Sequence, residues 1–394
     1  MKNGRRTIIT GLAVGFGLAS MIFYESLMQG MGAHMIESTT GSWMGDAQIH
    51  RNGFMDTKRI DLTVNQPDSV FSRLREDSTV YACTARILSP ASIASSTELK
   101  PVTLIGVDRE TDTKVTMLEA AVIAGSYLSP DSMDLIIGRK LANDLNVQPG
   151  DVIVVTVAQK DSGLTRNMFL VSGICSFGND DLDRYTAFVN LSTAGRMLGI
   201  PVDVHEIAVR FCRDRTGTDE FLNFTREFSV FGNSALGWPD LAPQVNTMIS
   251  MVNASMAATA LILFGLVVFG IVNSLFMSVY ERMYEFGIMK ALGTRPGTIS
   301  IMIILEAFWI AVISTLIGSA IGLLIILITS KTGISFGEIE FSGVVFNKPI
   351  FPLLRFSRIW IYPFFTLILT TASGIYPGIH AGRLNPSEAI RKSL

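Results

Sequence analysis

The sequence lacks the short motifs on which most nucleotide-binding and hydrolytic sites are built. It contains no GxxxxGKS/T segment for nucleotide phosphates and no HExxH zinc helix. Its three cysteines, Cys83, Cys175 and Cys212, are widely spaced and form no CxxC or Cys/His pattern. At most one disulfide is possible, and we expect three free, buried thiols instead. We also expect no bound metal or cofactor and no catalytic residue on this chain.

Charge is also scarce. Asp, Glu, Lys and Arg make up 17% of the 394 residues, whereas about a quarter is usual in soluble domains. The net charge of −2 argues against a nucleic-acid partner. Apolar residues reach 48% and are concentrated in a few long blocks. This composition predicts an α-helical integral membrane protein that also carries a substantial polar domain.

Four apolar blocks are long enough to cross a lipid bilayer as helices, which takes roughly 20 residues. They cover residues 7–27, 255–279, 298–330 and 359–376, of which the last is the shortest. We therefore predict four transmembrane helices.

The first block follows Lys2, Arg5 and Arg6, as the apolar core of a signal peptide does. It is longer than such a core, and no small-residue cleavage site follows, so we expect an uncleaved span; a signal peptide is the alternative. Gly11 and Gly15 form a GxxxG pattern that would let another helix approach closely, although chance spacing in a glycine-rich helix explains it as well.

Between the first and second blocks, short alternating runs and short helical patterns replace the long apolar ones. The alternation predicts strands at 99–107, 152–158, 167–174, 185–189 and 206–211. Helical spacing predicts helices at 139–145, 192–198 and 219–228. These elements indicate a mixed α+β domain of about 200 residues, which is large enough for its own core.

Three parts follow from this pattern. Residues 1–29 are expected to hold a cytoplasmic N-terminus and the first span, 30–244 an extracytoplasmic α+β domain, and 245–394 the remaining spans with a cytoplasmic helix at 280–297. Four spans put the N-terminus, the 280–297 segment and the C-terminal tail on one side, and their basic or mixed charge makes that side the cytoplasm. The basic residues of the 331–358 loop conflict mildly with this topology.

The insert between the second and third spans, YERMYEFGIMKALGTRPG, has a helical pattern. Gly293 should end this helix and Pro296 should block its continuation. Apolar contacts are expected from Met283, Phe286, Ile288 and Met289, and the charges are Glu281, Arg282, Glu285, Lys290 and Arg295. A short charged helix between two spans suits a protein that grips a partner at the membrane surface.

Two further polar features of the sequence are a charged residue within an apolar block and a cluster of aspartates. Glu306 is the one charged residue of the third block; such residues are costly in lipid, so it either packs against protein or extends to the nearby interface. Asp180, Asp181 and Asp183 form an acidic cluster without EF-hand spacing. We expect a solvated turn there rather than a calcium site.

Two passages resemble the four-span ABC transporter permeases of the FtsX/MacB-like superfamily, most of all its lipoprotein-releasing (LolC/LolE-type) branch. They are NSLFMSVYERMYEFGIMKALGTRPGTI, followed by ILEAFWIAVISTLIGSAIGLLI, and the C-terminal GIYPGIHAGRLNPSEAIR. The resemblance implies that residues 280–297 are a coupling helix that docks on a cytoplasmic ATPase. The motif positions on this chain are Glu281, Arg282, Glu285, Gly287, Lys290, Ala291 and Gly293.

The resemblance also implies the partners and the location. ATP and Mg would be bound by a partner ABC ATPase dimer, and a second permease chain would complete a homodimer or heterodimer in the bacterial inner membrane. The large domain would lie in the periplasm and respond to ATP hydrolysis by mechanotransmission. The implied function is extraction of a lipoprotein or another amphiphilic substrate from the outer leaflet; a regulator of a periplasmic hydrolase and a macrolide- or peptide-type exporter permease are the alternatives.

One loop departs from the family pattern. One lipoprotein-releasing permease uses an extended external hairpin to capture a periplasmic carrier protein, whereas the matching loop here, Gln159–Arg166, is short. The chain therefore resembles the non-capturing partner or a homodimeric relative, and whether a carrier docks on it stays open.

Methionines gather where the first two spans leave the membrane. Thioether side chains are flexible and polarizable, which suits a surface that accepts varied acyl chains. The resemblance implies a lipid-facing cavity between these spans in a dimer; packing at the junction of membrane and domain is the alternative. The residues are Met28, Met31 and Met35 on the first span and Met248, Met251 and Met256 on the second.

Overall fold

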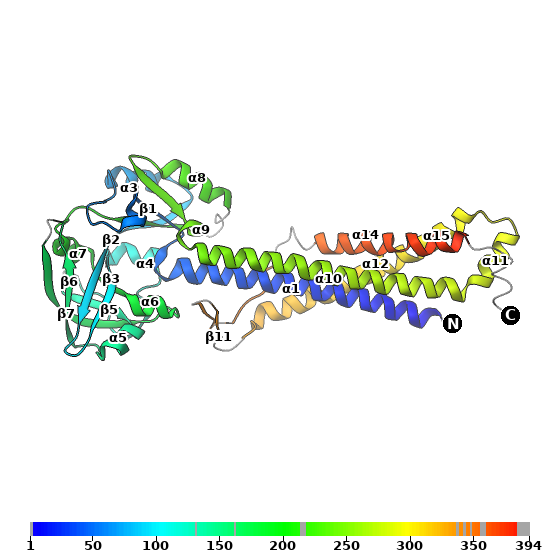
Figure 1. Cartoon of the computed structure of the whole chain (residues 1–394), viewed down its shortest axis with the longest axis horizontal. Coiled ribbons are helices and arrows are strands. Elements are labelled where there is room, and N and C mark those ends of the chain that lie inside the picture. The colour runs from blue at the N-terminus through cyan, green and yellow to red at the C-terminus, as the bar shows by residue number, and fades with distance from the viewer. Residues whose placement is uncertain are drawn as a thin grey trace. The chain divides into compact units, whose positions relative to one another are not determined.

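The computed structural model describes residues 3–130, 132–160, 163–212, 218–335, 339–341, 344–346, 349–354 and 360–383. Two compact units make up the chain, and their elements are labelled in Figure 1. A helical unit contains residues 1–33, 249–335 and 349–394, and a sheet unit contains residues 34–248 and 336–348. The expected C-terminal motif NPSEAIR lies outside the described residues.

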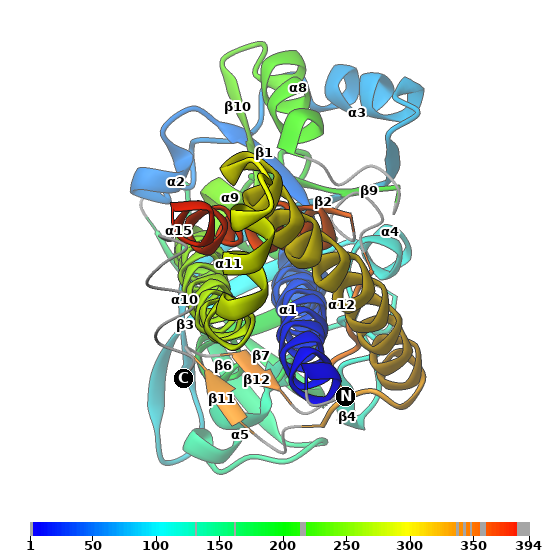
Figure 2. The ribbon, with the colours of Figure 1, turned by 90° about the vertical axis from the view of Figure 1, so that its right-hand side faces the viewer.

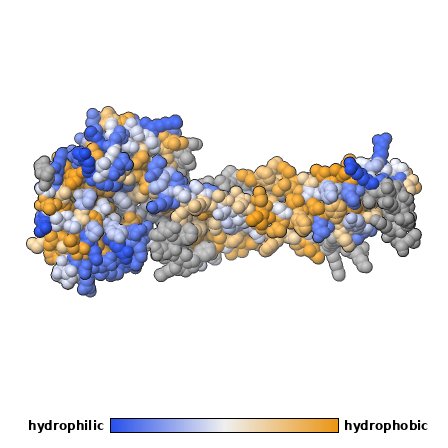
Figure 3. All heavy atoms as spheres, in the orientation of Figure 1, coloured by the Kyte–Doolittle hydropathy of each residue, from blue (hydrophilic) through white to orange (hydrophobic). Residues whose placement is uncertain are grey.

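Three helices are long and apolar enough to cross a membrane: Ile8–Met44, Pro243–Glu281 and Pro296–Thr332. They contain α1 (Asn3–Thr39), α10 (Pro243–Glu281) and α12 (Pro296–Thr332). In the space-filling view, apolar residues cover most of the surface along these helices, whereas polar and apolar residues alternate over the sheet unit (Figure 3).

The expected fourth span is divided, so four spans are not confirmed among the described residues. It consists of α14 (Ile361–Ser373) and α15 (Ile375–Arg383), which have 13 and 9 residues. Pro377 explains the break, because a proline ring clashes with the carbonyl four residues earlier, here that of Ser373. Both helices pack on α12: a Cβ at Gly374 would lie 2.7 Å from the Ala307 Cβ, and one at Gly378 would lie 3.0 Å from the Ser300 carbonyl oxygen.

Helix α1 packs against α12 through small residues. A Cβ added to Gly318 would lie 2.5 Å from the carbonyl oxygen of Gly15, and one added to Gly11 would lie 3.2 Å from the Ser314 hydroxyl. Ala19 faces Gly322 one turn further along. The interpretation of the GxxxG pattern as a site of close helix approach is therefore confirmed, and its partner is the third apolar block.

Within the described residues, the sheet unit contains a sheet of ten strands and a separate pair, β11 (Ile339–Phe341) and β12 (Val344–Phe346). In chain order the ten strands of the large sheet are β1 (Ala47–Arg51), β2 (Val80–Ala94), β3 (Leu99–Val107), β4 (Val122–Gly125), β5 (Asp134–Gly138), β6 (Val152–Ala158), β7 (Leu164–Cys175), β8 (Thr186–Asn190), β9 (Glu206–Phe211) and β10 (Asn233–Gly237). The helices are α2 (Phe54–Thr57), α3 (Pro67–Glu76), α4 (Arg109–Val115), α5 (Arg139–Leu145), α6 (Asp180–Tyr185), α7 (Leu191–Leu198), α8 (Thr218–Phe228) and α9 (Trp238–Leu241). All five predicted strands and all three predicted helices are confirmed.

The strands form a barrel with an extension. The order is β10-β1-β9-β2-β3-β8-β5-β7-β4, and β6 pairs with both β2 and β7. β6 thus closes a ring of six strands, in which β3–β8 and β5–β7 are the parallel pairs. Alternation along β6 buries Ile153, Val155 and Val157 in the core of this barrel. The extension has a second core, rich in phenylalanine, beneath α3 and α8.

The acidic cluster at the start of α6 is not simply a solvated turn. The Asp183 carboxylate is buried and accepts hydrogen bonds of 2.8 Å from the Ser176 hydroxyl and the Phe177 amide. Burial raises the pKa of Asp183. Asp180 forms an ion pair with Lys140. The expectation was wrong for Asp183 because a short helix can turn one carboxylate inward to cap the preceding loop. No group of described residues could hold a metal ion.

The three cysteines are free, as expected, but the expectation that all three are buried was wrong. Cys175 is buried, whereas Cys83 and Cys212 are partly exposed. The expected hairpin loop is shorter than the sequence indicated, because β6 extends to Ala158 and β7 begins at Leu164.

Candidate functional site

The segment between α10 and α12 folds into a separate short helix. α10 ends at Glu281, Arg282 leaves the helical conformation, and α11 (Met283–Ala291) follows. Gly293 has a φ of +92°. Its amide donates to the Lys290 carbonyl and the Thr294 amide to the Met289 carbonyl, which together form a Schellman motif. The predicted end of this helix is confirmed, although Pro296 also begins α12.

One side of α11 is anchored in the helical unit. Phe286 is buried in a cluster with Val279, Ile299, Ile303 and Ala381, which belong to α10, α12 and α15. The Lys290 Nζ atom donates a 2.9 Å hydrogen bond to the Gly382 carbonyl of α15. Figure 2 views α11 at the end of the unit where α10 finishes and α12 begins. A displacement of α11 would therefore act on three other helices.

The opposite side of α11 presents an apolar stripe. Tyr284, Ile288 and Leu292 lie four residues apart, so they share one face. They are 48%, 39% and 82% exposed. Apolar contacts were expected from Ile288 as well as from Phe286, but Ile288 lies on the exposed face, because two residues correspond to more than half a turn of helix. Sequence reasoning missed Tyr284 and Leu292, although their spacing of four was a usable signal.

The predicted coupling residues differ in how they are placed. Glu281, Glu285, Ala291 and Gly293 are exposed around the stripe, and Gly287 is buried beside Phe286. Arg282 and Lys290 are intermediate. The structure thus gives α11 an anchored face and a free apolar face bordered by acidic residues, which is an arrangement that suits protein–protein contact.

Arg282 connects this segment to the third apolar helix. Its Nη1 atom lies 3.2 Å from Glu306 Oε2, and its Nε atom lies 3.2 Å from Glu285 Oε2. The Ser278 hydroxyl also donates to Glu306 Oε1 at 3.3 Å. Of the two interpretations of Glu306, contact with protein is the one observed. The sequence identified both residues but not that they form a pair.

A second carboxylate of the helical unit escaped sequence reasoning. Glu25 is buried on α1, and its Oε2 atom accepts a 2.8 Å hydrogen bond from the Tyr362 hydroxyl of α14. Gln29, one turn further along α1, also donates to Glu25. Glu25 thereby links α1 to the first half of the divided fourth apolar block.

The six methionines are not all accessible. Met35 and Met256 are buried, Met28, Met31 and Met248 are intermediate, and Met251 is 64% exposed. The boundary between the two units falls among them. A substrate surface that includes Met35 and Met256 does not agree with their burial, so any such surface is limited to the other four.

Comparison with known proteins gives two family matches. Residues 257–386 match the FtsX-like permease C-terminal family, and residues 7–222 match the MacB-like periplasmic core domain. Together these matches cover parts of both units described above.

Individual relatives are distant. A lipoprotein-releasing system transmembrane protein LolC from Xylella fastidiosa is 22% identical over 410 residues, which covers 98% of this chain and 91% of that protein. The corresponding LolE from Haemophilus influenzae is 20% identical over 346 residues, covering 83% and 81%. A macrolide export ATP-binding/permease protein MacB from Bdellovibrio bacteriovorus is 32% identical over 143 residues, covering 36% of this chain and 19% of that protein.

Proposed function

The chain belongs to the FtsX/MacB-like family of ABC transporter permeases, and from this membership we propose that it couples ATP hydrolysis on a separate subunit to lipoprotein release. It is an inner-membrane protein with a periplasmic domain. The proposed substrate is a lipoprotein or another amphiphile that leaves the outer leaflet of that membrane.

The observation that carries this proposal is the extent of the match. The relative named for lipoprotein release aligns along almost the whole chain and almost its own whole length. A relative named for macrolide export, from Agrobacterium fabrum, also aligns along 98% of the chain, but over only 58% of its own length. A macrolide-type exporter is therefore the second candidate, since two relatives with that name have higher identities, 25% over 418 residues and 32% over 143 residues. The regulator of a periplasmic hydrolase has no comparable observation in its favour.

The proposed partner of α11 is the cytoplasmic ABC ATPase, which binds ATP and Mg. Its docking surface would be the stripe of Tyr284, Ile288 and Leu292, bordered by Glu281 and Glu285. Because Phe286 and Lys290 anchor α11 to α12 and α15, movement of the ATPase would be passed to the membrane helices. The Arg282–Glu306 pair provides a further connection to α12.

Two further parts of the proposal concern the substrate side. A second permease chain would complete the transporter, and Met28, Met31, Met248 and Met251 would contribute to an acyl-chain surface. The β6–β7 hairpin is short, so a periplasmic carrier would be captured by the other permease chain, or this chain would act in a homodimer.

The proposal is tested by reconstituting the chain with its ATPase and second permease in proteoliposomes that contain a radiolabelled triacylated lipoprotein. We expect ATP to move the lipoprotein into the soluble fraction. In the same assay Leu292→Asp should lower release at least tenfold, because it places a carboxylate in an apolar docking surface. The matched control is Leu222→Asp, which changes a leucine that is 53% exposed on α8 of the sheet unit.

Two outcomes would contradict the proposal. If no lipoprotein is released but a macrolide stimulates ATP hydrolysis, the exporter function is favoured. Release that is lowered equally by Leu292→Asp and Leu222→Asp would remove the docking assignment of α11 and leave lipoprotein release intact.

A further inference from the structure

One half of β2 has a strand partner on one side only. Within the described residues, Val80–Arg86 pairs with β9, whereas pairing with β3 begins at Arg86, opposite Val107. β3 cannot extend further along β2 because α4 begins at Arg109. The edge of β2 from Val80 to Ala85 is therefore open. Alternate peptide groups of such an edge point away from β9 and can accept another strand.

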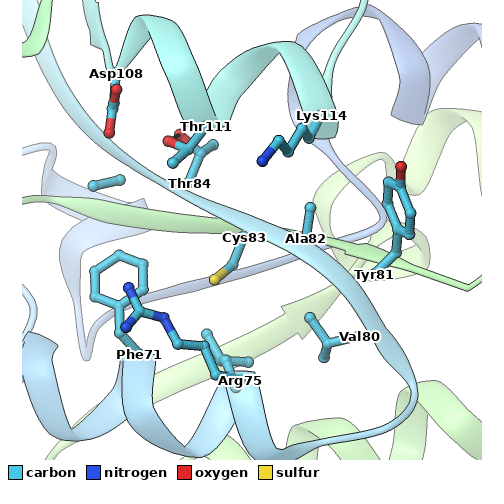
Figure 4. A pocket seen from close by; sticks show the side chains of 12 residues that line it. Phe71, Arg75, Val80, Tyr81, Ala82, Cys83, Thr84, Asp108, Thr111 and Lys114 are labelled. Carbon is cyan, nitrogen blue, oxygen red and sulfur yellow. Dashed lines mark hydrogen bonds between the residues drawn. The ribbon is translucent and has the colours of Figure 1, made fainter.

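A groove with a cavity volume of about 520 Å³ runs along this edge. All six residues from Val80 to Ala85 line it, together with residues of α3 and α4. Because side chains of a strand alternate between its two faces, six consecutive lining residues mean that the groove follows the edge of the strand. Figure 4 shows the strand with α4 above it and α3 below it.

The two helices contribute positive charge to the groove. Arg75 of α3 and Lys114 of α4 are exposed and both line it. Neither forms an ion pair within the described part of the chain. In Figure 4 their side chains extend toward β2 from opposite sides. The lining carboxylate, Asp108, caps α4 by accepting from the Glu110 amide.

The rest of the lining is compatible with an extended chain. Phe71 and Tyr81 add aromatic surface, and Tyr81 is 66% exposed. The hydroxyl groups of Thr84 and Thr111 lie 2.7 Å apart and hold α4 against β2. The groove therefore has helices on its walls, an open strand edge, and both aromatic and charged side chains in its lining.

We propose that this groove binds an extended polypeptide segment with acidic side chains, which adds to β2 as a further strand. Its peptide groups would pair with the open edge between Val80 and Ala85, and its carboxylates would meet Arg75 and Lys114. A lipid headgroup would satisfy the two cations but would leave the strand edge unpaired. The proposal concerns the sheet unit and does not depend on the proposed function of the transporter.

The test uses the full chain in nanodiscs and measures amide hydrogen exchange. The probe is a synthetic octapeptide of alternating Val and Glu, compared with its Val/Lys counterpart and with a Val/Glu peptide that is N-methylated at alternate residues. We expect the Val/Glu peptide to slow exchange at Val80–Ala85 in a saturable manner. N-methylation of the edge that faces β2 should abolish this protection.

Charge is tested with the double variant Arg75→Glu/Lys114→Glu, which should weaken Val/Glu binding at least fivefold and allow the Val/Lys peptide to bind instead. The matched control is Arg226→Glu, at an exposed arginine of α8. The proposal is overturned if neither peptide protects Val80–Ala85 or if the N-methylated peptide protects equally. Protection by phosphatidylglycerol in the nanodisc, with no effect of the peptides, would also overturn it.

Discussion

Each unit of this protein contains an arginine that binds two carboxylates, and the two clusters differ in burial. In the sheet unit, Arg86 lies 2.9 Å from Asp112 and 2.8 Å from Glu206, and all three side chains are 1% exposed. In the helical unit, Arg282 lies 3.2 Å from both Glu285 and Glu306, and it is 29% exposed. The chemistry is the same, but the surroundings are not.

Burial decides what each cluster can do. Arg86 joins β2 to α4 and β9, and the Thr116 hydroxyl donates to the second oxygen of Asp112. Removing one partner there would leave a charge buried without compensation. Arg282 can exchange its carboxylates for water at small cost. We therefore interpret the Arg86 cluster as a rigid contact within the periplasmic domain. We interpret the Arg282 cluster as a contact that can break when α11 moves.

The largest effect is expected at the buried cluster. Arg86→Leu should lower the free energy of unfolding of the sheet unit by about 3–5 kcal/mol, because Asp112 and Glu206 lose their cation. This change in the free energy of unfolding is measured by urea unfolding. The transition is followed by the fluorescence of Trp43, whose ring lies beneath the Arg86 guanidinium. The control Arg282→Leu should leave this transition unchanged. An equal and small effect of both variants would remove the distinction between the clusters.

A second prediction sharpens the comparison through pH. His50 lies beside Glu206, and burial, followed by the Lys58 charge, lowers the pKa of His50 to about 3. Between pH 6.5 and 3 the unfolded chain binds a proton there that the folded chain does not. Stability should therefore fall as the pH decreases, by roughly 1.4 kcal/mol per pH unit.

The variant His50→Gln isolates this contribution. Glu206 acts in the opposite direction, since burial raises its pKa, and Arg86 and His205 also face the site; all three remain in the variant. Urea midpoints measured from pH 7 to pH 5 should decrease less in His50→Gln than in the native chain. If the urea midpoint decreases equally in the native chain and in His50→Gln, His50 is protonated in the folded state.

The smallest effect on stability is expected at the half-buried cluster. Glu306→Gln should change the free energy of unfolding by less than about 1 kcal/mol, because the two side chains of the pair are still 29% and 30% exposed. It should nevertheless reduce lipoprotein release per ATP hydrolysed. Arg73→Gln, which breaks the exposed Arg73–Glu227 pair of the sheet unit, is the control with no effect on release. If the double variant Arg282→Glu/Glu306→Arg restores lipoprotein release per ATP hydrolysed, the ion pair itself is responsible for the coupling. If Glu306→Gln leaves this ratio unchanged, the pair does not contribute to coupling.

Periodicity explains which elements were predictable. β3, β6 and β9 have regular alternation and were predicted at their observed bounds. β2 was missed because it contains Pro90 and belongs to both the extension and the barrel: its first half pairs with β9 and its second half with β3 and β6. β1 and β10 are short and contain polar residues such as His50 and Asn233, which are buried by partners distant in sequence.

At the candidate site, the charged residues and the end of the helix could be predicted from the local sequence. The ion pairs between these residues could not. Gly293 could be identified as a helix terminator, because glycine accepts a positive φ that other residues resist. The pairing of Arg282 with Glu306, 24 residues later, depends on how α10 and α12 pack. The apolar stripe of α11 required knowledge of which face Phe286 buries.

The sequence by itself determined the membrane helices, the short helix between two of them and the presence of an α+β domain, because these depend on length, apolar content and local periodicity. Only the tertiary structure decided that the fourth apolar block is two helices, that Glu306 is paired, and that β2 keeps an open edge. These features depend on which distant segments meet, and contacts between distant segments leave no period in the sequence.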